Sequence, residues 1–538
     1  MSTFIQLFEE VIKDNNVTLH QIAARLEMEY HVLNRFKNGN RRRSAKLLKS
    51  ILNVVPCEME TEKKLYEALF REELEKVYGD DAYECVKMMK RLLSIQFMSR
   101  DEADESIKMV KNSNTENNPS CKLFCKRSAV HDEVLLILNQ ARISHSHQPV
   151  ILWGRGTDTL LSDIAFAFHN TTTKVEHLYP MMPATSKGSD LNNLKLMTQV
   201  MPCLRAAFDY NVRVVYEDLL AKETFFLYEC LLLTDKAALW IEKDYKHAQL
   251  VTDPQVLAFY RTRFEGQYKK SNAVLRRSVD ILEWQNNVQK IQAQGDCCYL
   301  SWQLCAMEFI PVDVLEKHIK EDKKEYLRQA LCVYENRLKS VRNKKRIEYI
   351  TLDGVKYFAN TGKILELPDE WYEPFSVKER YMVLESLLDI IKREYHAECC
   401  AENGDTQEFV VEKNDNRGRK VKDGNAHGSE EKNSNAQVYE TKDSNIRWCE
   451  TENKNLTVQI LNEKYFNLSC GIAIQSFNEA DTYMSYFEYG GRMIKVLFCE
   501  PGIKKWIFCL MELLPESGWL YSLKEQVDLL EEILEKML

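Results

Sequence analysis

Residues 18–39 read TLHQIAARLEMEYHVLNRFKNG. Thr18 and Gln21, three residues apart, form a capping box, which predicts that a helix begins at this point. A second helical pattern covers residues 30–37 and ends at Asn38-Gly39, because both of these residue types tolerate left-handed backbone. The stretch therefore predicts two short helices joined by a tight turn.

Apolar residues with helical spacing flank this pair on both sides. Within the pair, Ala23 is small enough to let the two helices cross closely, and Leu33 and Phe36 face inward. The flanking positions repeat at i, i+3 and i+4, which predicts one amphipathic helix before the pair and one after it. They are Phe4, Leu7, Phe8, Val11 and Ile12 on one side, and Leu47, Leu48, Ile51 and Leu52 on the other. Four or five short helices around one core suit a domain of about sixty residues.

Residues 4–52 resemble the Cro/repressor-type (Xre-type) helix-turn-helix domain. The resemblance rests on the amphipathic first helix, the central alanine of the next helix and the Asn-Gly end of the third. The matching residues are Ala23, Leu26, Leu33, Phe36, Asn38 and Gly39. In that family the start of the third helix enters the major groove, and residues around the turns hold phosphates. By position, the resemblance implies base contacts from Tyr30, His31 and Arg35 with help from Asn34, and phosphate contacts from Asn38, Arg41, Arg42 and Arg43.

Three positions depart from the family pattern. Glu27 replaces the usual turn glycine, Glu29 replaces a capping Ser or Thr, and Leu19 replaces a polar residue. Charge nevertheless favours nucleic acid: residues 1–56 contain nine Lys/Arg and five Asp/Glu, a local charge of +4 in a chain of net charge −8. Local positive charge on an acidic protein is typical of one DNA-binding module. The alternative is a small helical domain that binds protein or has no partner.

Composition bounds the class of protein. With 538 residues, 45% hydrophobic and 29% charged, the chain is expected to form several globular domains. It has no apolar run long enough to cross a bilayer, and its start, MSTFIQLFEE, lacks the features of a secretory signal, which together predict a cytoplasmic protein without membrane contact. The sixteen cysteines are scattered without a Cys-x-x-Cys pair, so we expect reduced thiols, no metal and no cofactor.

The pattern along the chain predicts a multidomain α+β protein with an N-terminal all-α helix-turn-helix bundle, a central α/β domain and a C-terminal α+β region. Strands that alternate with helices from residue 149 onward indicate the central domain, and dense mixed charge with few large apolar residues predicts disorder in 401–446. The predicted divisions are 1–56 (helix-turn-helix), 57–98 (helical connector or dimerisation), 99–129 (linker), 130–290 (α/β sensor domain), 291–400 (mixed α+β), 401–446 (disordered insertion) and 447–538 (C-terminal α+β).

Several dipeptides that contain glycine predict turns in the second half of the chain. Asp353-Gly354 and Thr361-Gly362 indicate turns between short strands, and Pro501-Gly502 indicates a hairpin turn before a further strand, IKKWIFCLMEL. A final amphipathic helix is expected over 523–538.

Gly154-Arg155-Gly156-Thr157 follows a predicted strand and precedes a predicted helix. Backbone N–H groups at such a place can hold phosphate, so Arg155 is predicted to contact a phosphorylated ligand. An ordinary strand-to-helix turn is the alternative, because the stretch lacks the Gly-Lys-Ser/Thr of a P-loop and the third glycine of a dinucleotide site.

Residues 234–268 resemble the phospholipase D-like fold, with a hairpin followed by an Asp-Pro helix that ends in aromatic residues. Those enzymes use His-x-Lys-x4-Asp. Here His247-x-Gln249 lacks the lysine, and His318-x-Lys320 is followed by Glu325 instead of Asp. The resemblance therefore implies a catalytically inactive sensor.

Together these features predict a bacterial, cytoplasmic transcriptional regulator that binds double-stranded DNA through its first domain. The large remainder is predicted to sense a small-molecule effector or to mediate assembly, and a homodimer would place two modules on two half-sites. The chain is predicted not to be an enzyme, with residues 130–395 left open. The alternatives are a DNA-targeted enzyme or defence effector with unrecognised catalytic residues, and a scaffold whose helix-turn-helix binds protein.

Overall fold

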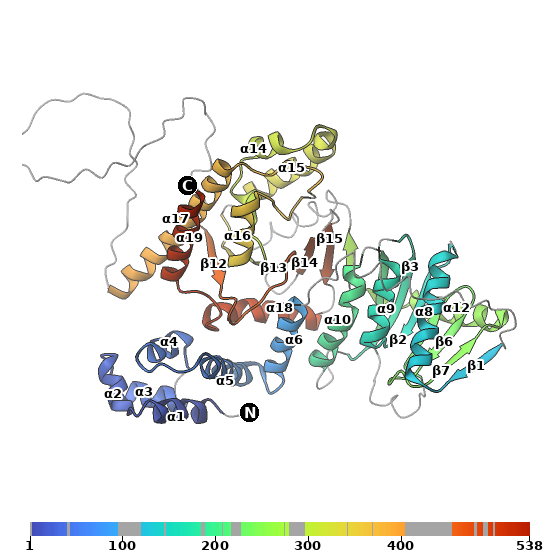
Figure 1. Cartoon of the computed structure of the whole chain (residues 1–538), viewed down its shortest axis with the longest axis horizontal. Coiled ribbons are helices and arrows are strands. Elements are labelled where there is room, and N and C mark those ends of the chain that lie inside the picture. The colour runs from blue at the N-terminus through green and yellow to red at the C-terminus, as the bar shows by residue number, and fades with distance from the viewer. Residues whose placement is uncertain are drawn as a thin grey trace, which may run out of the picture.

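The computed structural model shows a mixed α/β protein with an N-terminal group of helices and two β-sheets (Figure 1). In the part of the chain that it describes, no helix combines the length and apolar character needed to cross a bilayer. The described residues are 3–39, 43–94, 120–144, 147–169, 171–183, 189–206, 208–216, 228–273, 275–278, 296–341, 343–367, 369–403, 455–477, 481–487, 493–498 and 501–538. The insertion predicted at 401–446 lies almost entirely outside them.

The first core is built from short helices. The stacked rings of Phe4 and Phe8 lie 5.5 Å apart, and both meet the edge of Phe36. Leu33 and Leu48 complete this buried centre. The amphipathic pattern of the sequence is thereby confirmed for residues 4–54. The helices are α1 (Phe4–Asp14), α2 (Leu19–Arg25), α3 (Tyr30–Asn38), α4 (Ala45–Val54), α5 (Met59–Tyr78) and α6 (Ala82–Ser94).

Helix α5 belongs to two cores. Leu65 and Leu69 in its first half pack into the core of α1–α4, whereas Leu74 in its second half joins the largest core of the molecule. Val86 and Met89 of α6 lie in that same large core. Most apolar residues of α5 and α6 are thus covered by their own chain, whereas Val77 of α5 is exposed. The boundary predicted at residue 56 is corrected, because it would divide the first core.

The first sheet has eight strands in the order β1-β7-β6-β5-β2-β3-β4-β8. Strands β2, β3 and β4 are parallel, and the other pairs are antiparallel. The strands are β1 (Cys121–Phe124), β2 (Val150–Gly154), β3 (Lys174–Met181), β4 (Asp209–Tyr216), β5 (Cys230–Leu233), β6 (Ala238–Ile241), β7 (Ala248–Val251) and β8 (Asn272–Ala273).

Helices cover both faces of this sheet, so β2 and β5 at its centre are apolar along their length. Val150 and Leu152 of β2 face the large core, whereas Ile151 between them faces a smaller core with Leu257 and Phe264. The helices are α8 (Arg127–Ile143), α9 (Asp158–Phe168) and α10 (Ser189–Arg205) on the first face, and α12 (Pro254–Tyr268) on the second. Because β1 pairs with β7 and α8 begins at Arg127, the linker predicted at 99–129 is corrected at its end.

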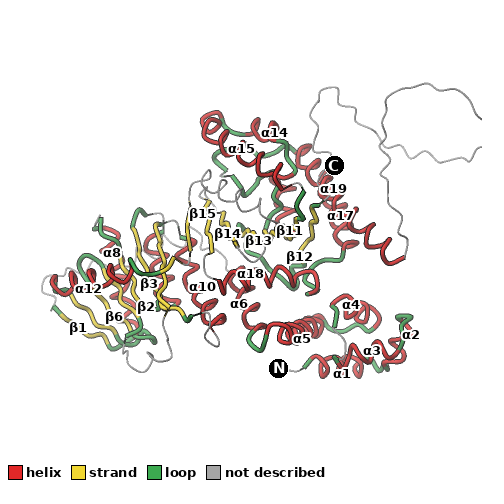
Figure 2. Tube along the Cα trace, turned by 180° about the vertical axis from the view of Figure 1, so that it is seen from behind, coloured by secondary structure: helices red, strands yellow, loops and turns green. Residues whose placement is uncertain are grey.

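The second sheet joins segments that are far apart in the sequence (Figure 2). Its order is β12-β11-β10-β13-β14-β15-β9, with β12, β11 and β10 parallel. Since β10 and β11 lie side by side between β12 and β13, two strands from the last ninety residues, the separation predicted between 291–400 and 447–538 is wrong. The strands are β9 (Leu275–Ser278), β10 (Cys297–Ser301), β11 (Arg346–Thr351), β12 (Leu456–Leu461), β13 (Ile472–Phe477), β14 (Asp481–Phe487) and β15 (Met493–Phe498).

Two predicted turns are helix starts. Thr351 ends β11, and its side chain accepts the N–H of Gly354 (3.0 Å), so Asp353-Gly354 forms the first turn of a helix. Pro501-Gly502 likewise begins a helix, not a hairpin, so the strand predicted after it is wrong. The helices around the second sheet are α14 (Val312–His318), α15 (Glu321–Val341), α16 (Leu352–Thr361), α17 (Val377–Asn403), α18 (Pro501–Leu513) and α19 (Leu523–Met537), with short 3₁₀ helices at Ala306–Glu308 and Leu514–Glu516.

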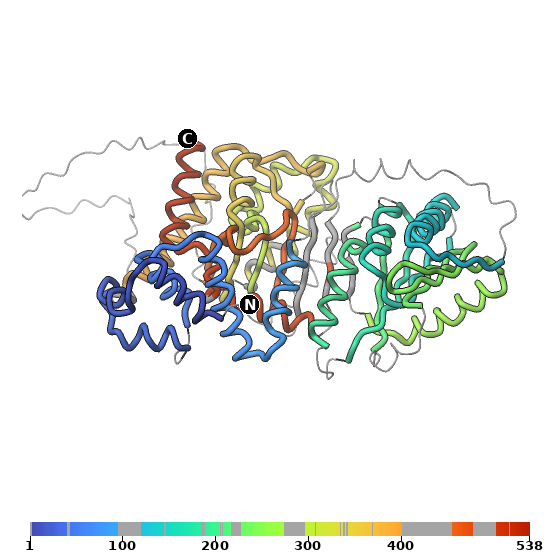
Figure 3. The backbone as a smooth tube through the Cα atoms, turned by 60° about the horizontal axis from the view of Figure 1, so that its bottom comes forward, coloured from blue at the N-terminus to red at the C-terminus, as the bar shows by residue number. Residues whose placement is uncertain are grey.

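The two sheets meet through α6, α10 and α18, which lie between them (Figures 1 and 3). The side-chain ammonium of Lys90 on α6 is buried here: it donates to the carbonyl of Tyr465 (2.9 Å) and lies 4.1 Å from the centre of the Trp519 ring. Burial lowers the pKa of Lys90 to about 8. The junction between the N-terminal helices and the second sheet is therefore a closely packed interface.

Candidate nucleic-acid interface and polar cleft

The turn between α2 and α3 has left-handed backbone at Glu27, where the family resemblance expects glycine. Thr18 caps α2 as predicted, because its side chain accepts the N–H of Gln21 while the Gln21 side chain accepts the N–H of Thr18. Glu27 has φ of 52°, in the left-handed region that glycine adopts without cost. Glu27 in place of the usual glycine therefore adds about 1 kcal/mol of backbone strain to this turn.

Helix α3 begins without a side-chain cap. Glu29 occupies the capping position but accepts no backbone hydrogen bond there. Its carboxylate instead lies 3.0 Å from Nδ1 of His31, and both side chains are largely exposed. The helix ends as predicted at Gly39, whose φ is 71°. The Glu29 carboxylate therefore engages one ring nitrogen of His31, a residue to which the resemblance assigns a base contact.

The outward face of α3 carries the predicted DNA-contacting residues. Tyr30, His31, Arg35 and Asn38 are exposed, and the half-buried Asn34 accepts a hydrogen bond from the Asn38 amide (3.2 Å). The Tyr30 ring stacks on His20 of α2, with centroids 3.9 Å apart and an angle of 8° between the planes. In Figures 1 and 2, α3 lies on the side of the N-terminal helices that faces away from α17 and α19. This surface is open to a large partner.

Arg43 does not lie on that surface. Only 3% of it is exposed, and its guanidinium packs 4.3 Å from the centre of the Phe4 ring. It donates to the carbonyls of Phe36 (2.8 Å) and Lys37 (2.7 Å) and pairs with Glu72 of α5. The predicted phosphate contact of Arg43 is thus corrected: the cation satisfies the last carbonyls of α3 and fixes that helix to α5. Arg41 and Arg42 lie outside the described residues.

Other basic residues of the domain are engaged in ion pairs. Lys37 lies 2.6 Å from Glu9, while Lys46 and Lys49 of α4 pair with Glu398 of α17 and Glu525 of α19 at 3.2 and 2.8 Å. Arg35, in contrast, has no carboxylate within ion-pair distance among the residues that the structure describes. On the outward face of α3, the free positive charge is that of Arg35.

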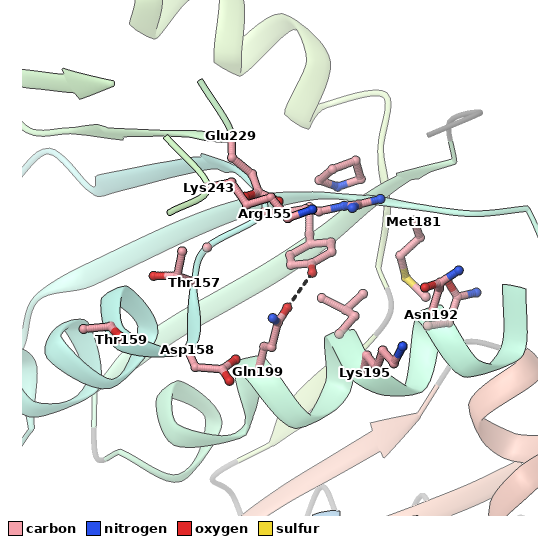
Figure 4. Close-up of a pocket in the computed structure, with 15 residues that line it drawn as sticks. Arg155, Thr157, Asp158, Thr159, Met181, Asn192, Lys195, Gln199, Glu229 and Lys243 are labelled. Atoms are coloured by element: carbon pink, nitrogen blue, oxygen red, sulfur yellow. Dashed lines mark hydrogen bonds between the residues drawn. The ribbon is translucent and has the colours of Figure 1, made fainter. Parts of the chain in front are cut away.

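A cleft of about 410 Å³ opens at the carboxyl ends of β2 and β3, beside the start of α9 (Figure 4). Arg155, from the turn after β2, lies along one wall near Glu229 and Lys243. Lys195 and Gln199 project from α10 on the opposite side, and Gln199 accepts a hydrogen bond from the buried Tyr179 hydroxyl (2.8 Å). The remaining lining residues are Gly156, Thr157, Asp158, Thr159, Pro180, Met181, Asn192, Asn193 and Leu196.

A glycine and a buried histidine lie next to the residues that line this cleft. Gly154 has φ of 115°, and a Cβ there would come within 2.2 Å of the Glu229 carbonyl, so β2 and the chain before β5 meet only because this side chain is absent. Below the turn, the two ring nitrogens of His177 lie 2.6 Å from the Tyr210 hydroxyl and 2.9 Å from the Gly154 carbonyl. Burial lowers the pKa of His177 to about 4, so the ring is neutral near pH 7.

The residues of the phospholipase D-like pattern do not form a catalytic group. His247 lies beside β7 and pairs with Glu242 (2.6 Å), and Gln249 on β7 contacts Cys121 of β1. His318 ends α14 and lies 3.0 Å from Glu379, in the half of the molecule that holds the second sheet. Within the described ranges, no three His, Cys, Asp or Glu side chains converge as metal ligands.

No family model matches this chain, and no curated protein matches it. Solved structures similar to it include TrmBL2, an archaeal chromatin protein whose structure shows a novel mode of DNA binding, at 13% identity over 38% of this chain and 69% of that one (TM-score 0.20). Polyphosphate kinase from Porphyromonas gingivalis aligns at 10% identity over 78% and 54% (TM-score 0.20), and phosphatidylserine synthase from Haemophilus influenzae Rd KW20 at 8% over 84% and 96% (TM-score 0.23). Such TM-scores establish neither a shared overall fold nor a shared activity. The Xre-type resemblance stays a prediction.

Sequence reasoning found Arg155 but missed its companions. Lys195 and Lys243 lie 40 and 88 residues further along the chain, in a helix and a hairpin turn with no motif of their own. The alternation of strands and helices gave a general signal, because ligands of open α/β sheets bind at the carboxyl ends of the strands. It did not reveal which helix would face Arg155.

Proposed function

We propose that this protein is a sequence-specific DNA-binding transcriptional regulator, in which α3 contacts the bases and the two-sheet region senses a ligand or mediates assembly. The proposal depends on how α3 is oriented. The apolar residues of this helix lie in the core, whereas Tyr30, His31 and Arg35 are exposed together on its outward face. Side chains at the start of such a helix are those that meet base edges in the major groove.

The chemistry of this face suits direct readout. An arginine can donate two hydrogen bonds to the O6 and N7 acceptors of guanine, and this is the commonest specific contact in the major groove. Arg35 is exposed and unpaired among the described residues, whereas Asn38 lies near the end of the helix, where a phosphate contact would fix its position. The stacking of Tyr30 on His20 holds that ring flat against α2 and limits its freedom before binding.

Genome-wide mapping of the DNA bound by the full-length protein tests the proposal and yields a candidate sequence. Fluorescence anisotropy with that sequence and a scrambled duplex then measures specificity. Arg35→Ala should weaken specific binding by about 1–3 kcal/mol and reduce the discrimination between the two duplexes. Lys64→Ala on α5 removes the same charge away from α3 and serves as the matched control.

Binding should weaken steeply with added salt, because each phosphate contact releases counterions. Equal affinity for both duplexes, or an affinity that Arg35→Ala and Lys64→Ala leave equally unchanged, would contradict base contact by α3. If both variants bind DNA like the parent, the alternative that the outward face of α3 binds a protein partner would be favoured.

A further inference from the structure

We propose that the cleft at the end of β2 binds a small phosphate monoester that also carries hydroxyl groups, such as a phosphorylated sugar or a nucleotide. This inference specifies the ligand in the sensing part of the proposed function. Its test uses no DNA, so that failure of ligand binding and failure of DNA binding are separate results.

Three cations from three separate elements line the cleft. Arg155 follows β2, Lys195 lies on α10, and Lys243 lies in the turn between β6 and β7. Neither Lys195 nor Lys243 has a carboxylate within ion-pair distance in the described part of the chain. The positive charges of these two lysines attract an anion to the cleft.

The start of α9 adds neutral donors to the same wall. The side chain of Thr157 accepts the N–H of Leu160 (3.2 Å), so the cap serves the third N–H of the helix. The N–H groups of Asp158 and Thr159, at the first two positions, are left for a ligand at the positive end of an eleven-residue helix. Gly156 lets this turn lie directly on Leu161, since a Cβ would come within 2.9 Å of that side chain.

The carboxylates in the cleft indicate which groups the ligand carries besides its phosphate. Asp158 and Glu229 balance two of the three cations, so the lining has a small positive excess and does not suit a highly charged anion. Carboxylates next to a phosphate site accept hydrogen bonds from hydroxyl groups, as they do from ribose in dinucleotide sites. Gln199, held by Tyr179, and Asn192 add amide groups, and about 410 Å³ exceeds what inorganic phosphate fills.

Isothermal titration calorimetry of the full chain, with thermal unfolding alongside, tests this inference. The probes are a hexose monophosphate, adenosine monophosphate, the parent hexose and inorganic phosphate. The variants are Arg155→Ala and Lys195→Ala, with Lys236→Ala as the matched control, because Lys236 is exposed in the β5–β6 turn outside the cleft. Circular dichroism confirms that each variant is folded, and the exposed position of Lys195 makes its replacement the less disruptive.

At least one phosphate monoester should bind and raise the unfolding temperature. Arg155→Ala and Lys195→Ala should weaken it by about 10- to 100-fold, the effect of losing one charge-assisted hydrogen bond, whereas Lys236→Ala should bind like the parent. The parent hexose and inorganic phosphate should each bind at least about tenfold more weakly. The inference is overturned if neither monoester binds at millimolar concentration, if the hexose binds as tightly as its phosphate, or if both cleft variants bind as the parent does.

Discussion

The outward face of α3 and the cleft beside α9 are two polar surfaces built in opposite ways. The first is convex and comes from nine consecutive residues whose spacing alone sets which side chains face outward. The second is concave and gathers residues from 155 to 243, which the order of strands brings together. The convex face has one free arginine on a simple helix, whereas the cleft depends on a glycine, a buried histidine and two packed helices.

This difference indicates where each surface is vulnerable. A change on α3 should alter contact with a partner while the domain stays folded, because its outward side chains lie outside the core. A change beneath the cleft should act first on folding and only then on binding.

Gly154→Ala should destabilise the protein by roughly 3–5 kcal/mol, because the new Cβ meets a backbone carbonyl and φ is positive. Gly39→Ala at the end of α3 should cost only about 1–2 kcal/mol, since there the neighbour is the end of the Arg43 side chain. Hydrogen exchange measured by mass spectrometry can follow residues 150–168 and 30–54 separately. Equal losses in the two variants would contradict the contrast.

Arg43→Ala should cost about 2–4 kcal/mol in the free energy of unfolding, because Glu72 loses its buried partner and two helix-terminal carbonyls lose their donor. Arg35→Ala, one α-helical turn before the end of α3, should change stability by less than about 0.5 kcal/mol. Urea unfolding monitored by circular dichroism compares them. If Arg43→Ala keeps full stability and loses only DNA affinity, the result would contradict the structural role of Arg43 and support the phosphate contact predicted from the sequence.

Acidification should loosen the cleft before it affects α3. The pKa of His177 is lowered to about 4 from 6.5 because the ring is buried, so its contribution to stability is complete above pH 6.5. As the pH falls towards 4, His177 is protonated in the unfolded chain but stays neutral in the folded protein. The free energy of unfolding therefore decreases by roughly 3 kcal/mol. Thermal unfolding between pH 7 and 4.5 should show a smaller decrease for His177→Gln than for the parent. An equal decrease would assign the acid sensitivity to other groups.

The exposed ion pairs of α4 should contribute least. Lys49 and Glu525 are each nearly half exposed, so a double-mutant cycle with Lys49→Ala and Glu525→Ala should give a coupling of about 0.2–1 kcal/mol that decreases with salt. Urea unfolding at two salt concentrations measures it. A coupling that salt does not change would show that the pair acts through packing.

Local signals predicted the parts of the fold that local chemistry decides. The capping box at Thr18 and the Asp-Pro start of α12 lie where the sequence predicts them. The turn between strands predicted at Asp353-Gly354 was wrong, because this dipeptide is typical of hairpin turns but lies here in the first turn of α16. Gly354 is there for a different reason: a Cβ at this helical position would come within 1.9 Å of the Trp302 carbonyl.

Features that depend on distant partners could not be predicted. Arg43 stands in a basic run typical of phosphate contact, and its burial depends on Glu72, which lies 29 residues away in a different helix. The second sheet likewise pairs β11 with β12, strands separated by more than a hundred residues. For the candidate sites, the sequence indicated the face of α3 and Arg155, whereas the other walls of the cleft follow from the strand order alone.

The double membership of α5 has a consequence for how such a protein can evolve. A 20-residue helix is about 30 Å long, and here one half closes the core of α1–α4 while the other enters the core between the sheets. A gene that exchanged its first 56 codons for those of another helical domain would leave Leu65 and Leu69 facing water. A recombination point before α5 would divide the first core, and one between α5 and α6 would divide the large core, so we expect the N-terminal helices and the sheets to be inherited together.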